Sequence, residues 1–199
     1  MNRRHLLAWP ALSALGLPSA RADAGSLVVR TRVATALGDF VVEVDPRVAP
    51  LTVANYLRHV DGHHLDGGAV YRLVSLANQG PQTRYKIEVV QWGMNLPDDK
   101  PGPFPPIAHE STRLTGLRHR DGTISMARNA PGSASAEFFV CIGEQPELDF
   151  GGHRNPDGQG FAAFGQVVEG MDVVRALHAR SQAEQWLAEP IAVRTVRRV

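Results

Sequence analysis

Apolar and polar residues alternate along most of this chain in short runs, which are separated by glycine, proline and small polar residues. This pattern is typical of β-strands, and β-branched side chains fill many of the runs. The predicted strands cover residues 26–34, 39–44, 69–74, 87–93, 123–126, 138–142, 161–167 and 191–199. The first two strands meet at Leu37-Gly38-Asp39 and therefore predict a hairpin.

Two segments instead repeat their apolar residues at the spacing of a helix. The first begins at Pro50, because the first turn of a helix tolerates proline, and it ends at Asp61-Gly62. The second covers Met171 to His178. Many short strands combined with only two helices predict a closed antiparallel β-barrel.

A loop of small residues joins two of the central strands. From Arg128 to Glu137 it has the sequence RNAPGSASAE, which has no helical period and carries one proline and one glycine. Side chains this small leave the backbone open, so we expect an extended peptide to pair with it as an added strand. The alternative is an ordinary surface connection, since most loops have no function of their own.

The first 22 residues have the composition of a secretory signal peptide. A basic start at Asn2-Arg-Arg-His5 precedes an apolar run from Leu6 to Leu17, and the small residues around Ala22 offer a cleavage site. We therefore predict a signal peptide over residues 1–22, a single domain over residues 23–199, and a periplasmic or secreted protein. The paired arginines also occur in twin-arginine signals, so the general and the twin-arginine export routes both stay open.

The charge balance argues against a nucleic-acid partner. The whole chain has 21 basic and 20 acidic residues, and the predicted signal peptide contains Arg3, Arg4 and Arg21 but no acidic residue. The remaining 18 basic and 20 acidic residues give a net charge of −2, whereas nucleic-acid binding calls for a basic patch. No stretch after the signal peptide reaches the ~20 apolar residues that a membrane span requires.

No metal site, disulfide or nucleophile is predicted. The histidines around His63 and His64 match none of the spacings that recur in metal sites. Ser133 and Ser135 lack the G-x-S-x-G context of a hydrolase nucleophile. The single cysteine, Cys141, follows the apolar residues Phe-Phe-Val, and we expect it to be a small buried side chain.

Eight short motifs follow one another along nearly the whole predicted mature chain. They are Leu37-Gly38-Asp39, Pro50-x-Thr52-Val-Ala-Asn55, Tyr71-Arg72, Gln91-x-Gly93, Gly122-Thr-Ile-x-Met-Ala127, Ser133-Ala-x-x-x-Phe-Phe139, Leu148-Asp149 and Phe164-Gly165-x-Val-Val-Glu-Gly-Met-Asp-Val173. One such motif would be weak evidence, but together and in this order they resemble the cyclophilin family of peptidyl-prolyl cis-trans isomerases. The resemblance implies a mainly β fold, a closed eight-stranded antiparallel barrel capped by two α-helices, in a bacterial, exported member of the family.

The activity that the resemblance implies needs neither metal nor cofactor. Isomerisation of an X-Pro bond breaks no covalent bond, and its barrier of ~20 kcal/mol comes from lost amide resonance. By resemblance, Arg72 is the catalytic donor that stabilises the twisted amide, and Gln91 holds a carbonyl group of the substrate. Among the other substrate-binding residues that the resemblance implies, Val89, Phe139, Leu148 and Phe161 line a proline pocket, Ala127 and Arg128 pair with the peptide through their backbone, Tyr71 lies at the rim, and Glu137 completes the set.

The chain departs from the family pattern at several positions. Acidic residues occur at Glu88 and Glu137 and, near the usual tryptophan, at Glu147, and the segment Ser75–Arg84 is an insertion. A rival function is therefore a peptide-binding or chaperone module that keeps the fold but has little isomerase activity. For either function we expect the partners to be proline-containing segments of exported proteins, bound by a monomer.

Overall fold

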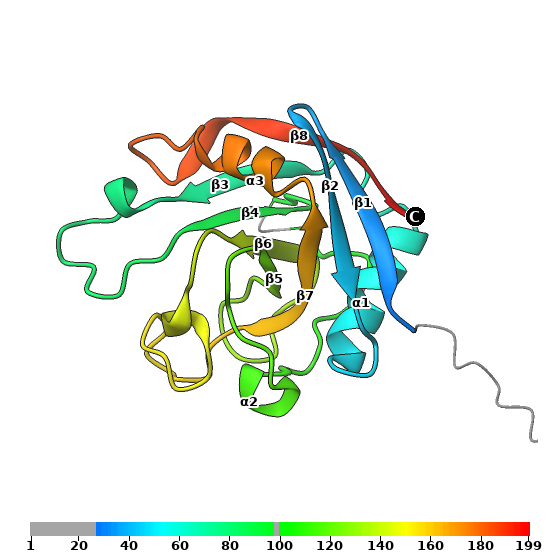
Figure 1. The fold of residues 1–199 in the computed structure, drawn as a ribbon, viewed down its shortest axis with the longest axis horizontal. Coiled ribbons are helices and arrows are strands. Elements are labelled where there is room, and N and C mark those ends of the chain that lie inside the picture. Colours follow the sequence, from blue (N-terminus) through cyan, green and yellow to red (C-terminus); the bar gives the residue numbers. More distant parts are fainter. Residues whose placement is uncertain (1–26, 98–99) are drawn as a thin grey trace, which may run out of the picture.

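Eight strands form one closed antiparallel barrel, as predicted (Figure 1). The computed structural model describes residues 27–97 and 100–199, and the predicted signal peptide lies outside this part of the chain. The strands are β1 (Val29–Thr35), β2 (Gly38–Val44), β3 (Ala69–Val74), β4 (Val89–Gly93), β5 (Thr123–Met126), β6 (Glu137–Cys141), β7 (Ala162–Glu169) and β8 (Trp186–Arg198). They follow one another around the barrel as β1-β2-β7-β5-β6-β4-β3-β8, and β8 pairs with β1 to close it.

Among the residues that the structure describes, three α-helices accompany the barrel, one more than predicted. The helices α1 (Pro50–Asp61) and α3 (Met171–His178) have the predicted bounds and lie on different sides of the barrel (Figure 1). The third, α2 (Thr112–Thr115), is a single turn, which is too short to show a helical period. Two 3-10 turns, η1 (Leu76–Asn78) and η2 (Pro146–Leu148), likewise lie in segments that were predicted as loops.

A carboxylate from a loop that is distant in the sequence caps the first turn of helix α1. The buried side chain of Glu110 accepts hydrogen bonds from the backbone N–H groups of Leu51 at 3.1 Å and of Thr52 at 2.6 Å, and from the Thr52 hydroxyl at 2.7 Å. A helix leaves the N–H groups of its first turn unpaired, and a negative charge there suits the helix dipole. Glu110 therefore fixes the start of α1 against the segment that precedes α2.

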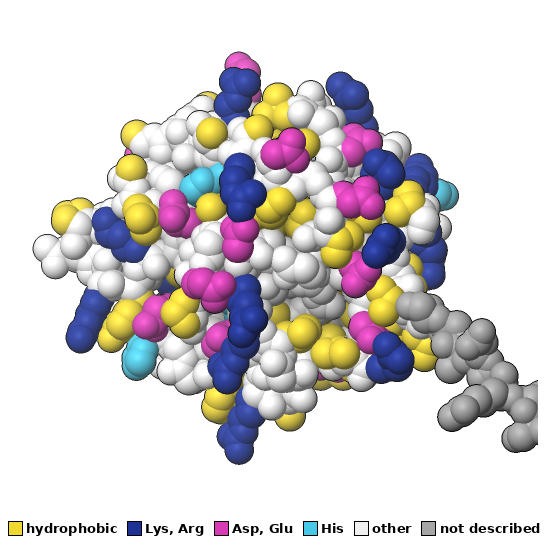
Figure 2. Space-filling view, viewed as in Figure 1, with side chains coloured by type: hydrophobic (Ala, Val, Ile, Leu, Met, Phe, Trp, Pro, Cys, Tyr) yellow, Lys and Arg dark blue, Asp and Glu magenta, His cyan; other side chains and the backbone are white. Residues whose placement is uncertain are grey.

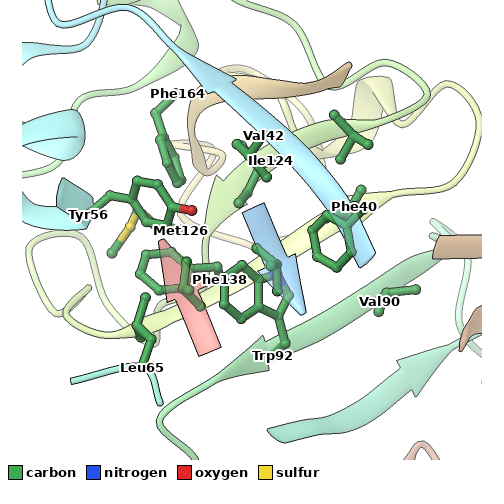
Figure 3. Packing of buried hydrophobic residues seen from close by; sticks show 14 of the residues in the cluster. Phe40, Val42, Tyr56, Leu65, Val90, Trp92, Ile124, Met126, Phe138 and Phe164 are labelled. Carbon is green, nitrogen blue, oxygen red and sulfur yellow. The ribbon is translucent and has the colours of Figure 1, made fainter. Parts of the chain in front are cut away.

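Aromatic side chains fill the inside of the barrel (Figure 3). Trp92, Phe138 and Phe164 come from three different strands, pack with Tyr56 of α1, and like it are no more than 1% exposed. The Phe138 ring lies 5.2 Å from the Tyr56 ring and 5.3 Å from the Trp92 ring, measured between centroids. Because the interior is a packed core, a binding site has to lie on the outer surface.

The last strand differs most from its predicted bounds. It begins at Trp186 rather than at Ile191, whereas every other predicted strand end is within three residues of the observed one. The segment Leu187–Pro190 has no β-branched residue and ends in proline, which donates no hydrogen bond to a neighbouring strand. Its pairing with β3 contains a register shift between Val70 and Arg72, opposite this proline segment.

Charged residues of both signs are interspersed over the face of the molecule in Figure 2. Some of them form ion pairs, for example Arg198 with Asp61 at 2.7 Å and Arg30 with Glu43 at 2.9 Å. Exposed pairs of this kind contribute about 0 to 1 kcal/mol each, so the packed barrel supplies most of the stability. Among the helices of the described residues, none is long and apolar enough to cross a membrane.

Candidate active site

Three adjacent strands, β3, β4 and β6, contribute side chains to one patch on the outside of the barrel. Successive residues of a strand point to opposite faces, so Val89 and Gln91 of β4 lie outside while their neighbours fill the core. In β6 the same alternation places Glu137 and Phe139 outside. Gln91 pairs with Phe139 on one side and with Arg72 of β3 on the other. The strand register therefore brings these side chains together.

A pocket of about 450 Å³ lies over this patch. All ten residues predicted for catalysis and substrate binding line it, namely Tyr71, Arg72, Val89, Gln91, Ala127, Arg128, Glu137, Phe139, Leu148 and Phe161. Another pocket of about 400 Å³, between Asp45 and Arg118, is lined by none of them. The structure thus gathers the predicted residues into a single site, while their individual roles stay predictions.

One wall of the pocket is an apolar cluster separate from the barrel core. Val89, Phe139 and Leu148 are buried in it, and Phe161 packs against them. The rings of Phe139 and Phe161 meet edge to face, with 5.4 Å between their centroids. Ile87 also belongs to this wall and was not predicted. Such a wall excludes water and suits a small apolar ring.

A continuous row of hydrogen bonds crosses the pocket from Arg72 to Glu137. Arg72 Nη1 donates to Gln91 Oε1 at 3.0 Å, Gln91 Nε2 donates to the Tyr71 hydroxyl at 2.8 Å, and this hydroxyl donates to Glu137 Oε2 at 2.6 Å. Glu137 also accepts from the backbone N–H of Asn95 at 3.0 Å. Each side chain orients the next, so the row holds Arg72 and Gln91 in fixed positions.

Two amide oxygens hold the guanidinium of Arg72. Gln185 Oε1 accepts from Arg72 Nε at 3.1 Å and from Nη2 at 2.6 Å, in addition to the bond that Gln91 accepts from Nη1. A guanidinium has five N–H groups, so these three bonds leave one N–H free on each Nη nitrogen. Within the described part of the chain no carboxylate forms an ion pair with Arg72, so its charge is not neutralised locally.

Burial shifts the ionisation of the groups in this row. It raises the pKa of the Glu137 carboxyl, although hydrogen bonds from Tyr71 and from the backbone of Asn95 oppose the shift. Burial and the nearby Glu137 charge raise the pKa of Tyr71, so its hydroxyl stays protonated and remains a donor. Burial, followed by the charge of Arg154, lowers the pKa of Arg72, but an arginine stays charged at neutral pH.

The loop after β5 leaves backbone groups open beside the pocket. The Ala127 N–H donates to the Glu137 carbonyl at 2.9 Å and so cannot bind a peptide. The Ala127 carbonyl and both backbone groups of Arg128 have no backbone partner among the residues that the structure describes. The backbone pairing predicted for these two residues is therefore possible through Arg128 and the Ala127 carbonyl, and not through the Ala127 N–H.

The side chain of Arg128 is turned away from solvent and is only 1% exposed. It forms an ion pair with Asp157 at 2.8 Å, and its Nε donates to the Gly160 carbonyl at 2.8 Å. The hydrogen bond from Arg128 lowers the pKa of Asp157 to about 2. Arg128 thus joins the central loop to the loop before β7, and it also lines the pocket.

Further residues in or beside the pocket were not predicted, and three of them contact or lie near its polar side chains. Trp186 lines the pocket, is 61% exposed and stacks on Tyr71 with 5.5 Å between ring centroids. Gln185 precedes it and holds Arg72, and Arg154 reaches the pocket from the loop before β7. These residues lie in segments without strand or helix periodicity, so the sequence pattern gave no signal for them.

Two acidic residues that depart from the family pattern, Glu88 and Glu147, do not line the pocket. Glu147 instead accepts a hydrogen bond from the backbone N–H of His153 at 2.8 Å and pairs with its ring at 3.0 Å. Of the three carboxylates considered from the sequence, Glu137 is the one that reaches this pocket.

A serine, a histidine and an aspartate form a buried hydrogen-bonded triad. His119 Nε2 lies 2.9 Å from Ser125 Oγ, and His119 Nδ1 lies 2.8 Å from Asp149 Oδ1. All three residues are at most 6% exposed and none lines the pocket, so a substrate cannot reach the hydroxyl. The hydroxyls of Ser133 and Ser135 bond to backbone carbonyls rather than to a histidine. The triad is a structural link between β5 and the end of η2.

The described residues thus form a closed antiparallel β-barrel that has on its outer face a pocket with one apolar wall, an arginine without an ion-pair partner among those residues, and an open stretch of backbone. The sequence pattern of the family described as cyclophilin type peptidyl-prolyl cis-trans isomerase/CLD matches residues 29–198. The chain belongs to this family, and it is an isomerase. The predicted family, barrel and enzyme class are thereby confirmed.

Individual relatives agree with this assignment. A peptidyl-prolyl cis-trans isomerase of Streptomyces antibioticus is 35% identical over 145 residues, which cover 72% of this chain and 79% of that protein. Peptidyl-prolyl cis-trans isomerase B of Escherichia coli is 32% identical over 69% of this chain and 76% of its own length. The crystal structure of a cyclophilin type isomerase of Cryptosporidium parvum has a TM-score of 0.66 at 16% identity, over 86% of this chain and 98% of that one, and so supports the fold.

Proposed function

We propose that Arg72 is the catalytic residue of this isomerase and that Gln91 anchors the substrate backbone beside it. The observation that carries the proposal is the state of the Arg72 guanidinium, which lines a pocket with an apolar wall, is held by neutral amide oxygens and keeps two N–H groups without a partner among the described residues. As the C–N bond of an X-Pro amide twists, the prolyl nitrogen regains a lone pair. A donor that is already in place stabilises this state more than the planar ground state.

The remaining groups position the peptide. The proline ring packs on the wall formed by Phe139 and Phe161, and the peptide backbone pairs with Arg128. Gln91 Nε2 donates one of its two N–H groups to Tyr71 and has the other available for a carbonyl oxygen of the substrate. In this mechanism the enzyme forms and breaks only hydrogen bonds.

The second candidate function is a peptide-binding or chaperone module with little isomerase activity. It is favoured by the occupied side chain of Gln91, whose oxygen and one N–H are already used within the protein. Measuring cis-trans exchange of an X-Pro tetrapeptide by NMR, with and without the protein, separates the two functions. Catalysed exchange supports the isomerase with Arg72 as donor, and peptide binding without faster exchange supports the binding module.

The proposal includes export, because residues 1–22 have the composition of a signal peptide. The substrates are then proline-containing segments of exported proteins, and the enzyme acts as a monomer in the periplasm or outside the cell. Mass spectrometry of protein recovered from the periplasm should give an N-terminus at Asp23 or Gly25. An intact Met1 in a cytosolic fraction would overturn this part of the proposal.

A further inference from the structure

Two loops that border the pocket pack against each other. One joins β3 to β4 and extends on the left in Figure 1, and the other is the yellow loop before β7. Arg154 Nη1 of the second loop donates to Gln79 Oε1 and to the Tyr85 carbonyl of the first, both at 3.0 Å. The Tyr85 ring stacks on His153 with 4.8 Å between centroids. These contacts hold Arg154 in place as part of the pocket lining.

Gln79 makes this anchor rigid. Its side chain is 5% exposed and forms hydrogen bonds across the base of its own loop, from Nε2 to the carbonyls of Ser75 and Ile87 at 2.8 Å and from the Ile87 N–H to Oε1 at 3.1 Å. Arg154 donates to the same Oε1 atom. The insertion therefore provides a closed loop that fixes one end of the Arg154 guanidinium.

The other end of this guanidinium has no partner among the residues that the structure describes. Arg154 Nε and Nη2 donate no hydrogen bond to any described residue, and they are not among the buried polar atoms that lack a partner, so they are accessible. Burial lowers the pKa of Arg154, and the charge of Arg154 contributes to lowering the pKa of Arg72. The two guanidiniums therefore interact across the pocket.

The charged side chains that line the pocket differ in whether they have a partner of opposite charge or a hydrogen-bond partner. Arg128 is paired with Asp157, and the Glu137 carboxylate is bound by Tyr71 and a backbone N–H. Neither Arg72 nor Arg154 has an ion-pair partner in the part of the chain that the structure covers. One part of the pocket therefore carries two like charges and no counter-charge.

We propose that Arg154 is a specificity-determining residue that binds a carboxylate of the substrate close to the prolyl bond. A guanidinium presents a planar fork of donors that matches a carboxylate, and an anion between Arg154 and Arg72 relieves their repulsion. The carboxylate belongs either to an Asp or Glu side chain next to the proline or to the chain terminus that follows it. The inference rests on the proposed function, because it places the substrate in the same pocket as Arg72.

The test measures kcat/KM for a series of short X-Pro peptides. An acetylated and amidated peptide with Gln next to the proline is compared with peptides that carry Glu before it, Glu after it, or a free carboxylate directly after it. The wild-type protein should prefer at least one acidic peptide by roughly tenfold, the effect of one charge-assisted hydrogen bond. Which peptide is preferred shows the source of the carboxylate. Equal rates for all four peptides would overturn the proposal.

Variants connect the preference to this side chain. Arg154→Met should abolish the acidic preference, measured in that variant as the ratio of kcat/KM for the Glu and Gln peptides, because the ratio does not depend on the overall activity of the variant. Arg154→Lys should keep part of the acidic preference. Arg84→Met is the matched control, since Arg84 is an exposed arginine of the neighbouring loop that does not line the pocket. An unchanged preference in Arg154→Met would contradict the assignment.

Failure of the inference differs from failure of the proposed function. If the protein turned over no peptide, calorimetric titration with the Glu and Gln peptides would still report the preference as a ratio of Kd values, lost in Arg154→Met. If it turned over all peptides without regard to charge, the isomerase would stand and the role of Arg154 would be wrong.

Discussion

The hydroxyl of Tyr71 donates a 2.6 Å hydrogen bond to the partly buried carboxylate of Glu137. The same hydroxyl accepts from Gln91, which in turn accepts from Arg72. All donors in this row therefore point in one direction, from a cation at one end to an anion at the other. An arrangement of this kind fixes which side-chain groups of Gln91 remain available to a substrate.

Replacing Glu137 with Gln should remove a pH-dependent part of the protein's stability. Burial raises the pKa of this carboxyl in the folded protein, so folding favours the protonated acid. Stability from this group therefore rises as the pH falls from the folded pKa to the usual value of 4.5. Glu137→Gln lacks this part of the profile, so its stability should change less with pH than that of the wild type.

Urea denaturation between about pH 4 and 8 measures this effect. The exposed Glu144, changed to Gln, serves as the control. The idea fails if the pH profile of Glu137→Gln has the same slope as that of the wild type.

Changing Gln185 to Ala should reduce catalysis without unfolding the protein. Arg72 then loses the acceptor of two of its three hydrogen bonds, and a misplaced donor costs roughly tenfold or more in kcat. Gln185→Glu should keep Arg72 in position but pair with its charge, so it should also lower kcat. KM should change little in both variants.

Steady-state kinetics with a thermal melt of each variant checks this prediction. Gln182→Ala is a matched control, because Gln182 is an exposed glutamine in the same loop. A Gln185→Ala variant with the kcat of the wild type would remove Gln185 from any positioning role.

The stability of the protein should fall in acid because of His59. This side chain is fully buried against Phe104, and neither ring nitrogen has a partner among the described residues. Burial, followed by the charges of Arg58 and His64, lowers its pKa from 6.5 to about 4. Protonation therefore favours the unfolded chain, and stability that is fully present above about pH 6.5 is lost as the pH falls to about 4.

The loss from His59 amounts to about 3 kcal/mol. His59→Phe should remove it, while His63→Gln, at an exposed position, should leave it in place. The measurement is the free energy of unfolding of the three proteins at about pH 7 and pH 4.5. Equal acid sensitivity of His59→Phe and the wild type would assign the loss to another group.

Local patterns predicted those elements whose own residues determine them. Helix α1 begins at its proline and ends before Gly62, and most strands have a clear alternation of apolar residues. The one-turn helix α2 and the start of β8 were missed, because four residues show no period and Pro190 interrupts a strand that its neighbours stabilise. The secondary structure of these two segments depends on their contacts with distant parts of the chain.

The residues of the pocket likewise divide into those that local patterns predicted and those that depend on tertiary contacts. The predicted site residues come together because the motif residues of β3, β4 and β6 point outward and lie opposite one another in the paired strands. Gln185 lies 113 residues from Arg72 along the chain, and Arg154 reaches Gln79 across 75 residues. Contacts between residues so far apart in the sequence depend on the folded path of the loops that carry Gln185, Gln79 and Arg154, which no local pattern encodes.

The most direct test of the account is kcat/KM for isomerisation of a neutral X-Pro tetrapeptide by the wild type, Arg72→Ala and Arg194→Ala. Arg194 is an exposed arginine of β8 outside the pocket, so its removal gives the same change in charge. Loss of one donor to the twisted amide should cost Arg72→Ala ~3 kcal/mol, a factor of about a hundred or more, while Arg194→Ala keeps the activity of the wild type. Wild-type turnover by a folded Arg72→Ala variant would contradict the central claim.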